Sequence, residues 1–250
     1  MEEVLAYKSP SLLADKLSHY CPGCHHGTVH KLVAQCLEEM DLVDDTICVG
    51  SIGCSVFIYN YLMLDSVEAP HGRAPAVATG VKRSRPDKIV FTYQGDGDLA
   101  SIGLAEIMHA ANRGEKFSVV FVNNTVYGMT GGQMAPTTLV GQKTTTCPGG
   151  RCADREGMPM RMAEIIAGLG GVAYSARVAV NNIKNFKNAK KALRNVFEVQ
   201  QSGKGFGFVE VLASCPTNWK MSSPDANERI EKEMIPYFPL GIFKDIQGDS

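Results

Sequence analysis

The stretch DKIVFTYQGDGDLASIGLAEIMHAANRGEKFSVVFVNN, residues 87–124, determines the fold class. Residues 87–94 and 116–124 are apolar runs of strand length, and the segment 99–114 between them has a helical pattern that ends at Gly114. A strand, a helix and a second strand in so short a segment form a βαβ unit, with parallel strands and a right-handed crossover. The segment therefore predicts an α/β fold built on a parallel sheet.

The alternation of strands and helices continues on both sides of this unit. Helices are predicted at 26–40, 71–85, 160–171 and 182–203, and further strands at 46–53, 172–180 and 205–215. We expect one doubly wound, mostly parallel sheet in a single domain that spans residues 1–250. This domain has an N-terminal CxxC segment (about 1–27), a long active-site loop (about 128–160) and a C-terminal tail (about 216–250). Within the tail, MIPYFPLGIFKD at 234–245 lacks helical spacing, and we expect it to pack over the domain or against a partner.

Composition excludes several functional classes. The formal net charge is −1, which gives no electrostatic reason to expect a nucleic acid or an anionic membrane as partner. The N-terminus lacks the basic and apolar regions of a signal peptide, and no apolar run approaches the roughly 20 residues that span a bilayer. We therefore expect a cytoplasmic protein.

Polar residues follow the two strands of the βαβ unit, in GDGD at 95–98 and NN at 123–124. Because parallel strands end at one edge of a sheet, where ligands bind, we expect Asp96 and Asn124 to lie side by side. The glycines let a ligand approach the backbone, and the following helix N-terminus attracts a diphosphate. A carboxylate repels that anion unless a hard cation lies between them. We predict that Asp96, the Asn124 side chain and the Val126 carbonyl hold Mg²⁺ against a diphosphate.

Two features of GDGD limit its interpretation. It lacks the G-x-G-x-x-G register of a dinucleotide fingerprint, and no acidic residue follows at the ribose-binding distance. Asp98 has two interpretations, because an aspartate at the start of a helix is also a common N-cap.

With YGMTGGQ at 127–133 and CPGC at 21–24, this pattern resembles the diphosphate-binding motif of thiamine diphosphate enzymes. The chain is similar to the β subunits of the 2-oxoacid:ferredoxin oxidoreductases from about Cys21 to the tail, and HGRAPAVATGVK at 71–82 also matches that family. The resemblance implies a thiamine diphosphate-binding fold that holds Mg²⁺. The residues that it places at the cofactor are Ser55, His71, Gly72, Gly95, Asp96, Gly97, Asp98, Asn124, Tyr127, Gly128 and Met129.

Eight cysteines are many for a reducing compartment, where metal ligation is commoner than disulfides. Cys21 and Cys24 form a C-x-x-C turn, while Cys54 and Cys215 each follow a predicted strand at the edge that carries Asp96. Four thiolates can hold Zn²⁺ or a [4Fe–4S] cluster, and spacing alone leaves both open. The resemblance implies that these four cysteines hold a [4Fe–4S] cluster beside the thiamine ring.

The other four cysteines fall into two groups. Cys36 lies on the apolar face of a predicted helix and Cys48 lies in a predicted strand, so we expect both in the core. Cys147 and Cys152 lie in the long loop, and a second metal or redox site there stays open.

The resemblance also implies a reaction. A 2-oxoacid is oxidatively decarboxylated to an acyl-coenzyme A and carbon dioxide, and the electrons pass through the cluster to ferredoxin, in a heteromeric complex of anaerobic metabolism. His71 is the candidate catalytic residue in this chain. The glutamate that activates thiamine belongs to a pyrimidine-binding domain, for which 250 residues leave no room. The expected partners are a companion subunit with that domain, and ferredoxin or a ferredoxin-like subunit.

The substrate and the class of protein have alternatives. The loop sequence is most similar to 2-oxoisovalerate (branched-chain) members, but Lys143, Arg151 and Arg155 could anchor the second carboxylate of 2-oxoglutarate. A non-oxidative thiamine decarboxylase or synthase module would need no cluster. A zinc-stabilised module without catalysis would use the four cysteines for structure only.

Overall fold

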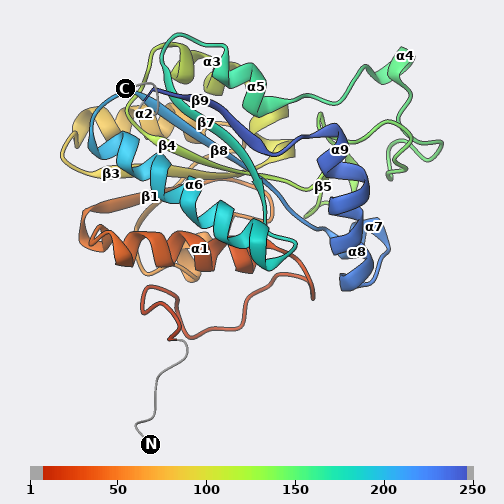
Figure 1. Cartoon of the computed structure of the whole chain (residues 1–250), viewed down its shortest axis with the longest axis horizontal. Coiled ribbons are helices and arrows are strands. Elements are labelled where there is room, and N and C mark those ends of the chain that lie inside the picture. The colour runs from red at the N-terminus through yellow and green to blue at the C-terminus, as the bar shows by residue number, and fades with distance from the viewer. Residues whose placement is uncertain (1–7, 247–250) are drawn as a thin grey trace, which may run out of the picture.

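A computed structural model describes residues 8–246, and its centre is a seven-stranded sheet in the order β2-β1-β3-β4-β8-β7-β9 (Figure 1). Six neighbouring strands run parallel, and the edge strand β9 runs antiparallel to β7. The expectation of a doubly wound, mostly parallel sheet is confirmed. The strands are β1 (Thr46–Gly50), β2 (Asp65–Glu68), β3 (Ile89–Gly95), β4 (Ser118–Asn123), β7 (Val172–Ala179), β8 (Phe206–Leu212) and β9 (Gly241–Asp245).

The βαβ unit forms as the sequence predicts. Strand β3 leads into a π-helical turn, Asp98–Ile102, then into α3 (Leu104–Asn112), and the chain reverses at Gly114 with a φ of 66°. Strand β4 then pairs in parallel with β3, and Gly95 lies opposite Val122. This register places the residues that follow the two strands at the same edge of the sheet.

Helices cover both faces of the sheet (Figure 1). On one face lie α1 (His26–Glu39) and α6 (Ile183–Gln201), which pack through their apolar faces into one core cluster. On the other face lie α2 (Ala74–Ser84), α3 and α5 (Met162–Ala167), which form a second cluster with residues of the sheet. The Asn182 side chain caps α6 by accepting a hydrogen bond from the backbone N–H of Asn185 at 2.8 Å.

The C-terminal tail is more regular than the sequence indicates. It contains α7 (Pro216–Trp219), α8 (Ser223–Arg229), a π-helical turn (Ile230–Met234), α9 (Ile235–Tyr237) and β9. The prediction that 234–245 lacks helix is wrong at its start, because helical structure continues through Tyr237. The tail does pack over the domain, through a third apolar cluster that includes Trp219 and Phe238.

The loop 128–160 is irregular over most of its length. Its exceptions are a small hairpin of β5 (Val126–Tyr127) with β6 (Gln133–Met134), and a helical turn, α4 (Ala153–Glu156). The buried guanidinium of Arg151 donates hydrogen bonds to backbone carbonyls on both sides of it in sequence, those of Ala135, Pro136, Thr138, Glu156, Gly157 and Met158. No helix within residues 8–246 has the length and apolarity to cross a membrane.

Candidate active site

The carboxyl ends of β3 and β4 form a pocket of about 100 Å³ that contains most of the residues predicted for the cofactor. Asp96, Asn124 and Val126 lie in its wall together, as the sheet register requires. The same wall contains Ser55, His71, Gly95, Gly97, Asp98, Tyr127, Gly128 and Met129. Gly72 is the one predicted residue outside this lining, and it contacts the pocket through Asp98.

Asp96 is a buried acid that no basic side chain neutralises in the described part of the chain. Its Oδ2 accepts a hydrogen bond from Thr137 Oγ1 at 2.6 Å, and its Oδ1 accepts one from the backbone N–H of Gly97 at 2.9 Å. Burial raises the pKa of Asp96 to about 7, and these hydrogen bonds offset only part of that effect. A carboxylate held in this way fits a bound cation, which would compensate for the lost solvation.

The turn after β4 contributes Asn124 and Val126 to the wall of the same pocket. Asn124 Oδ1 accepts a hydrogen bond from the backbone N–H of Val126 at 3.3 Å, which orients the side-chain oxygen. Between them, Thr125 has a φ of 63°, a conformation that costs a β-branched residue about 1–3 kcal/mol. The Thr125 carbonyl accepts a hydrogen bond from Thr138 Oγ1 at 2.6 Å, so the loop holds the strained turn in place.

Asp98 binds the 71–72 turn. Its carboxylate accepts hydrogen bonds from Gly72 N–H at 2.6 Å, from Gln94 Nε2 at 2.5 Å and from the ring Nδ1 of His71. Asp98 makes no side-chain cap on the following helical turn, so its N-cap interpretation is wrong. With Nδ1 of His71 engaged, ring nitrogen Nε2 is left to act in the pocket.

Two glycines shape the pocket because they have no side chain. A Cβ on Gly97 would lie 2.4 Å from the Tyr127 ring, and a Cβ on Gly128 would lie 3.1 Å from Cys54 Sγ. The same point at Gly128 is 3.7 Å from Cys215 Sγ and 3.8 Å from Asn124 Nδ2. Gly128 therefore lies between the candidate metal site and two of the candidate cluster cysteines.

Cys21, Cys24, Cys54 and Cys215 line a second cavity, of about 360 Å³, that adjoins the first. The two cavities share His26, Cys54, Asn124, Gly128 and Met129 in their walls. Burial, together with the neighbouring thiols, raises the pKa of Cys24 and of Cys54 to about 12. All eight cysteines are free thiols. Four thiols around one cavity, of which Cys215 is buried and Cys21 exposed, fit a positively charged metal centre, which would ionise them.

The four thiols line one cavity, and both kinds of metal centre that the spacing allows, a zinc ion and a [4Fe–4S] cluster, take thiolate ligands. Within residues 8–246, no three His, Cys, Asp or Glu side chains are grouped closely enough to hold a single metal ion. Cys36 of α1 and Cys48 of β1 are fully buried in the core cluster between these elements, as expected.

Several residues at the site were not predicted. Thr137 bonds Asp96 from the long loop, and His26 lies between Tyr20 and Tyr93, with its Nδ1 2.9 Å from the Tyr93 hydroxyl. Burial lowers the pKa of His26 to about 3, so its ring stays neutral near pH 7. Asn218 lines the cysteine cavity and bonds to Cys215 and to Gly128, which lies in the wall of both cavities.

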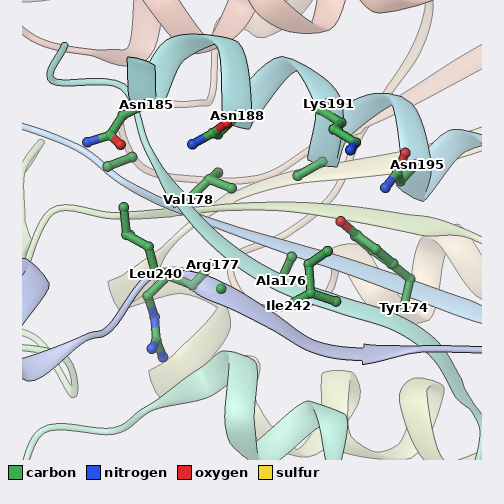
Figure 2. Close-up of a pocket in the computed structure, with 13 residues that line it drawn as sticks. Tyr174, Ala176, Arg177, Val178, Asn185, Asn188, Lys191, Asn195, Leu240 and Ile242 are labelled. Atoms are coloured by element: carbon green, nitrogen blue, oxygen red, sulfur yellow. The ribbon is translucent and has the colours of Figure 1, made fainter. Parts of the chain in front are cut away.

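A different cavity, of about 310 Å³, lies between α6, β7 and the segment that leads into β9 (Figure 2). Figure 2 shows the amides of Asn185, Asn188 and Asn195 along its α6 side. Its lining contains none of the predicted site residues and no carboxylate or thiol. We assign the active site to the edge of the sheet instead.

Comparison with known proteins identifies the family of the chain. Residues 51–211 match the family model described as thiamine pyrophosphate enzyme, C-terminal TPP binding domain; thiamine pyrophosphate is thiamine diphosphate. Ketoisovalerate oxidoreductase subunit VorA of Methanothermobacter marburgensis is 46% identical over 250 residues, 100% of this chain and 52% of the relative. 2-Oxoglutarate synthase subunit KorB of Methanocaldococcus jannaschii is 40% identical over 206 residues, 81% of this chain and 72% of the relative.

A solved structure shares the fold. It is a 2-oxoglutarate:ferredoxin oxidoreductase from Magnetococcus marinus with 2-oxoglutarate, coenzyme A and succinyl-CoA bound. It superposes with a TM-score of 0.74 at 24% identity, over 96% of this chain and 85% of that chain.

The fold and the matched residues define a thiamine pyrophosphate-binding domain. Within that class, the chain belongs to the family of 2-oxoacid:ferredoxin oxidoreductase subunits, which confirms the resemblance seen in the sequence. It spans about half the length of its ketoisovalerate relatives, 52% and 50% of the two.

Proposed function

We propose that this chain is the thiamine diphosphate-binding β subunit of a 2-oxoacid:ferredoxin oxidoreductase. The complex converts a 2-oxoacid and coenzyme A into an acyl-coenzyme A and carbon dioxide, and two electrons pass singly to ferredoxin. The observation that carries the proposal is the shared wall of the two cavities, in which Gly128 lies between Asn124 and the cysteines. An electron acceptor bound by those cysteines adjoins the thiamine pocket.

Three groups at the rim of the sheet hold Mg²⁺ in this proposal. They are the Asp96 carboxylate, the Asn124 side-chain oxygen and the Val126 carbonyl, and the diphosphate supplies further oxygen ligands. The backbone of Gly95 and Gly97 leaves room for that diphosphate. Ser55, His71, Gly72, Asp98, Tyr127, Gly128 and Met129 complete the thiamine site.

Cys21, Cys24, Cys54 and Cys215 hold the [4Fe–4S] cluster. When bound, thiamine supplies the nucleophilic carbon that the substrate needs, and the cluster supplies a one-electron acceptor. The protein orients both groups and excludes water from between them.

His71 is the residue of this chain that we assign to proton transfer. Its Nδ1 is bonded to the Asp98 carboxylate, which fixes the proton on Nδ1 and leaves Nε2 able to accept one, and the residue lines the thiamine pocket. The glutamate that activates thiamine comes from the pyrimidine-binding domain of a companion subunit, outside these 250 residues. Ferredoxin or a ferredoxin-like subunit is the second partner.

A branched-chain 2-oxoacid, 2-oxoisovalerate, fits this chain better than 2-oxoglutarate. A second carboxylate needs a cationic anchor, yet no lysine or arginine of residues 8–246 lines the thiamine pocket. Of the three cationic residues of the loop, Arg151 donates the hydrogen bonds of its guanidinium to backbone carbonyls. The Nε of Arg155 lies 3.2 Å from the carboxylate of Glu156. Lys143 lines a different cavity. The two ketoisovalerate relatives are also more similar in sequence than the 2-oxoglutarate relatives.

The setting in this proposal is the cytoplasm of an organism with anaerobic metabolism. The eight free thiols fit a reducing compartment, and exposed clusters are sensitive to oxygen.

The test is to isolate the chain with its partners under anaerobic conditions and to measure iron, colour and ferredoxin reduction. We expect brown protein that reduces ferredoxin with 2-oxoisovalerate and coenzyme A, and several-fold less with 2-oxoglutarate. Active but iron-free protein would favour the non-oxidative decarboxylase or synthase. Inactive protein with one zinc per chain would favour the structural module.

A further inference from the structure

Helix α7 (Pro216–Trp219) lines the cysteine cavity and bonds to residues in the wall that this cavity shares with the thiamine pocket. Trp219 Nε1 donates a hydrogen bond to the carbonyl oxygen of Asn124 at 3.1 Å. The side-chain amide of Asn218 donates one to the carbonyl oxygen of Gly128 at 2.8 Å, and one to Cys215 Sγ at 3.3 Å. One short helix thus links the turn that follows β4, which carries Asn124, to Cys215, a candidate cluster ligand.

The loop 127–133 is shaped around the Asn218 side chain. Gly132 has a φ of 83°, and a Cβ there would lie 3.0 Å from Asn218 Oδ1 and 3.1 Å from Asn218 Cβ. Any other residue at 132 would push the amide away from Cys215. The glycines of the YGMTGGQ segment therefore leave the amide one position, against Gly128 on one side and Gly132 on the other.

Cys215 differs from the other three candidate cluster ligands. In the described part of the chain, it is the one among the four whose sulfur accepts a hydrogen bond from a side chain. Donors that favour the thiolate also favour the more negative, reduced state of a cluster bound to it.

We propose that Asn218 is a positioning residue that raises the reduction potential of the cluster through Cys215 and holds this ligand beside the thiamine pocket through Gly128. This inference rests on the proposed function, since it requires a cluster on the four cysteines. A purely structural Asn218 would support the loop and leave the potential unchanged.

The experiment is a redox titration of the anaerobically isolated complex, followed by electron paramagnetic resonance. The signal of this cluster is identified as the one that disappears in Cys54→Ala. We expect a more negative midpoint potential in Asn218→Ala, because the sulfur loses a donor. We expect a still more negative one in Asn218→Asp, which has nearly the same shape but adds a negative charge. Iron content per complex should equal that of the wild type.

The control is Asn188→Ala, which truncates an exposed amide on α6. Asn188 lines the cavity between α6 and β7 and does not line the cavity of the four cysteines. Its midpoint potential should equal that of the wild type. Unchanged midpoints in both Asn218 variants, with full iron content, overturn the inference and leave the proposed function standing. Iron loss in both variants also overturns it, because a tuning residue leaves the four ligands in place. A wild-type complex with no iron on this subunit overturns both proposals.

Discussion

The carboxylate of Asp98 accepts a hydrogen bond from the backbone N–H of Gly72 at 2.6 Å. These residues lie 26 positions apart, and the bond joins the end of β3 to the turn that precedes α2. The same carboxylate binds the ring of His71. The second acid of GDGD is therefore a positioning residue for His71, and the first acid is the one that we propose as a metal ligand.

Asp98→Ala should destabilise the chain and weaken thiamine diphosphate binding. The Gly72 N–H and the Gln94 amide lose a buried acceptor, which costs about 2–3 kcal/mol of unfolding free energy. Asp98→Asn should cost less, because Gln94 Oε1 lacks a partner and its amide can rotate to accept from the new asparagine. Urea unfolding and calorimetric cofactor titration measure both effects. Equal losses in the two variants would contradict this role for Asp98.

Mg²⁺-dependent binding of thiamine diphosphate should weaken at acidic pH. The metal needs the ionised form of Asp96, whose pKa burial raises to about 7. Affinity should fall about tenfold per pH unit below that value and should be nearly constant above it. Calorimetric titration at several pH values with saturating Mg²⁺ measures the profile. A constant affinity between pH 5 and 8 would show that Asp96 does not ligate the metal.

The cofactor-free chain should respond to pH in the opposite sense. The folded state holds the Asp96 proton more tightly than the unfolded state does, since its pKa is raised from 3.8. This contribution to stability is complete below about pH 4 and is lost as the pH rises to about 7. Asp96→Asn should remove that part of the pH dependence and leave the chain at least as stable at pH 8. Thermal unfolding of both proteins without Mg²⁺ tests this, and a less stable Asp96→Asn chain at pH 8 is the contrary outcome.

Gly97→Ala should disrupt the pocket without unfolding the chain. The new methyl group would lie about 2.4 Å from the Tyr127 ring, which is at the pocket wall and half-buried, so the ring must move. Overpacking of this kind costs about 1–3 kcal/mol. Cofactor affinity should fall at least tenfold, and Gly97→Ala combined with Tyr127→Ala should recover fold stability but not affinity. Unimpaired binding by the single variant would mean that the ring is not part of the site.

A buried ion pair supports the end of β4 through Asn123. Arg177 is fully buried, and its Nε lies 2.9 Å from Glu210 Oε2. The other carboxylate oxygen of Glu210 accepts a hydrogen bond from Asn123 Nδ2 at 2.7 Å. Removing one partner of a buried pair costs about 3–5 kcal/mol. Glu210→Ala should lose that much unfolding free energy, whereas Glu164→Ala, at the half-exposed side of the same arginine, should lose about 1 kcal/mol. Chemical denaturation compares them, and equal costs would contradict this account.

Much of the site follows from the sequence because it depends on strand ends. The parallel register brings Asp96 to Asn124, and Cys54 and Cys215 follow strands β1 and β8 of the same sheet. These placements need only the order of the strands and the rule that ligands bind at their carboxyl edge. The same rule could not decide the role of Asp98. A helix N-cap and a residue of the cofactor site would both stand at this position, directly after the strand.

The remaining contacts depend on how irregular segments fold back, which periodicity does not encode. Thr137 comes to Asp96 from a loop that Arg151 holds together through six backbone carbonyls. Strand β9 has too few residues to show an alternating pattern, and its place beside β7 is fixed by packing of the tail. Asn218 acts through single hydrogen bonds to a carbonyl and a sulfur, and neither leaves a pattern in the sequence.

We propose four of the cysteines as cluster ligands, whereas Cys36 and Cys48 lie in the core, and iron content should distinguish the two groups. Cys54→Ala removes a thiol from the cavity wall, and three remaining ligands should not keep a [4Fe–4S] cluster through isolation. Cys48→Ala removes a thiol of the same size from the core cluster, where it packs against apolar side chains. We expect Cys54→Ala to lose most of its iron and its brown colour with little change in thermal stability of the cofactor-free chain. Cys48→Ala should keep its iron and lose about 1 kcal/mol of unfolding free energy.

Iron analysis, visible absorbance and thermal unfolding of the two variants, prepared anaerobically in parallel, give the comparison. If both variants kept their iron, the cluster would be bound elsewhere in the complex, and the cavity lined by the four thiols would need another explanation.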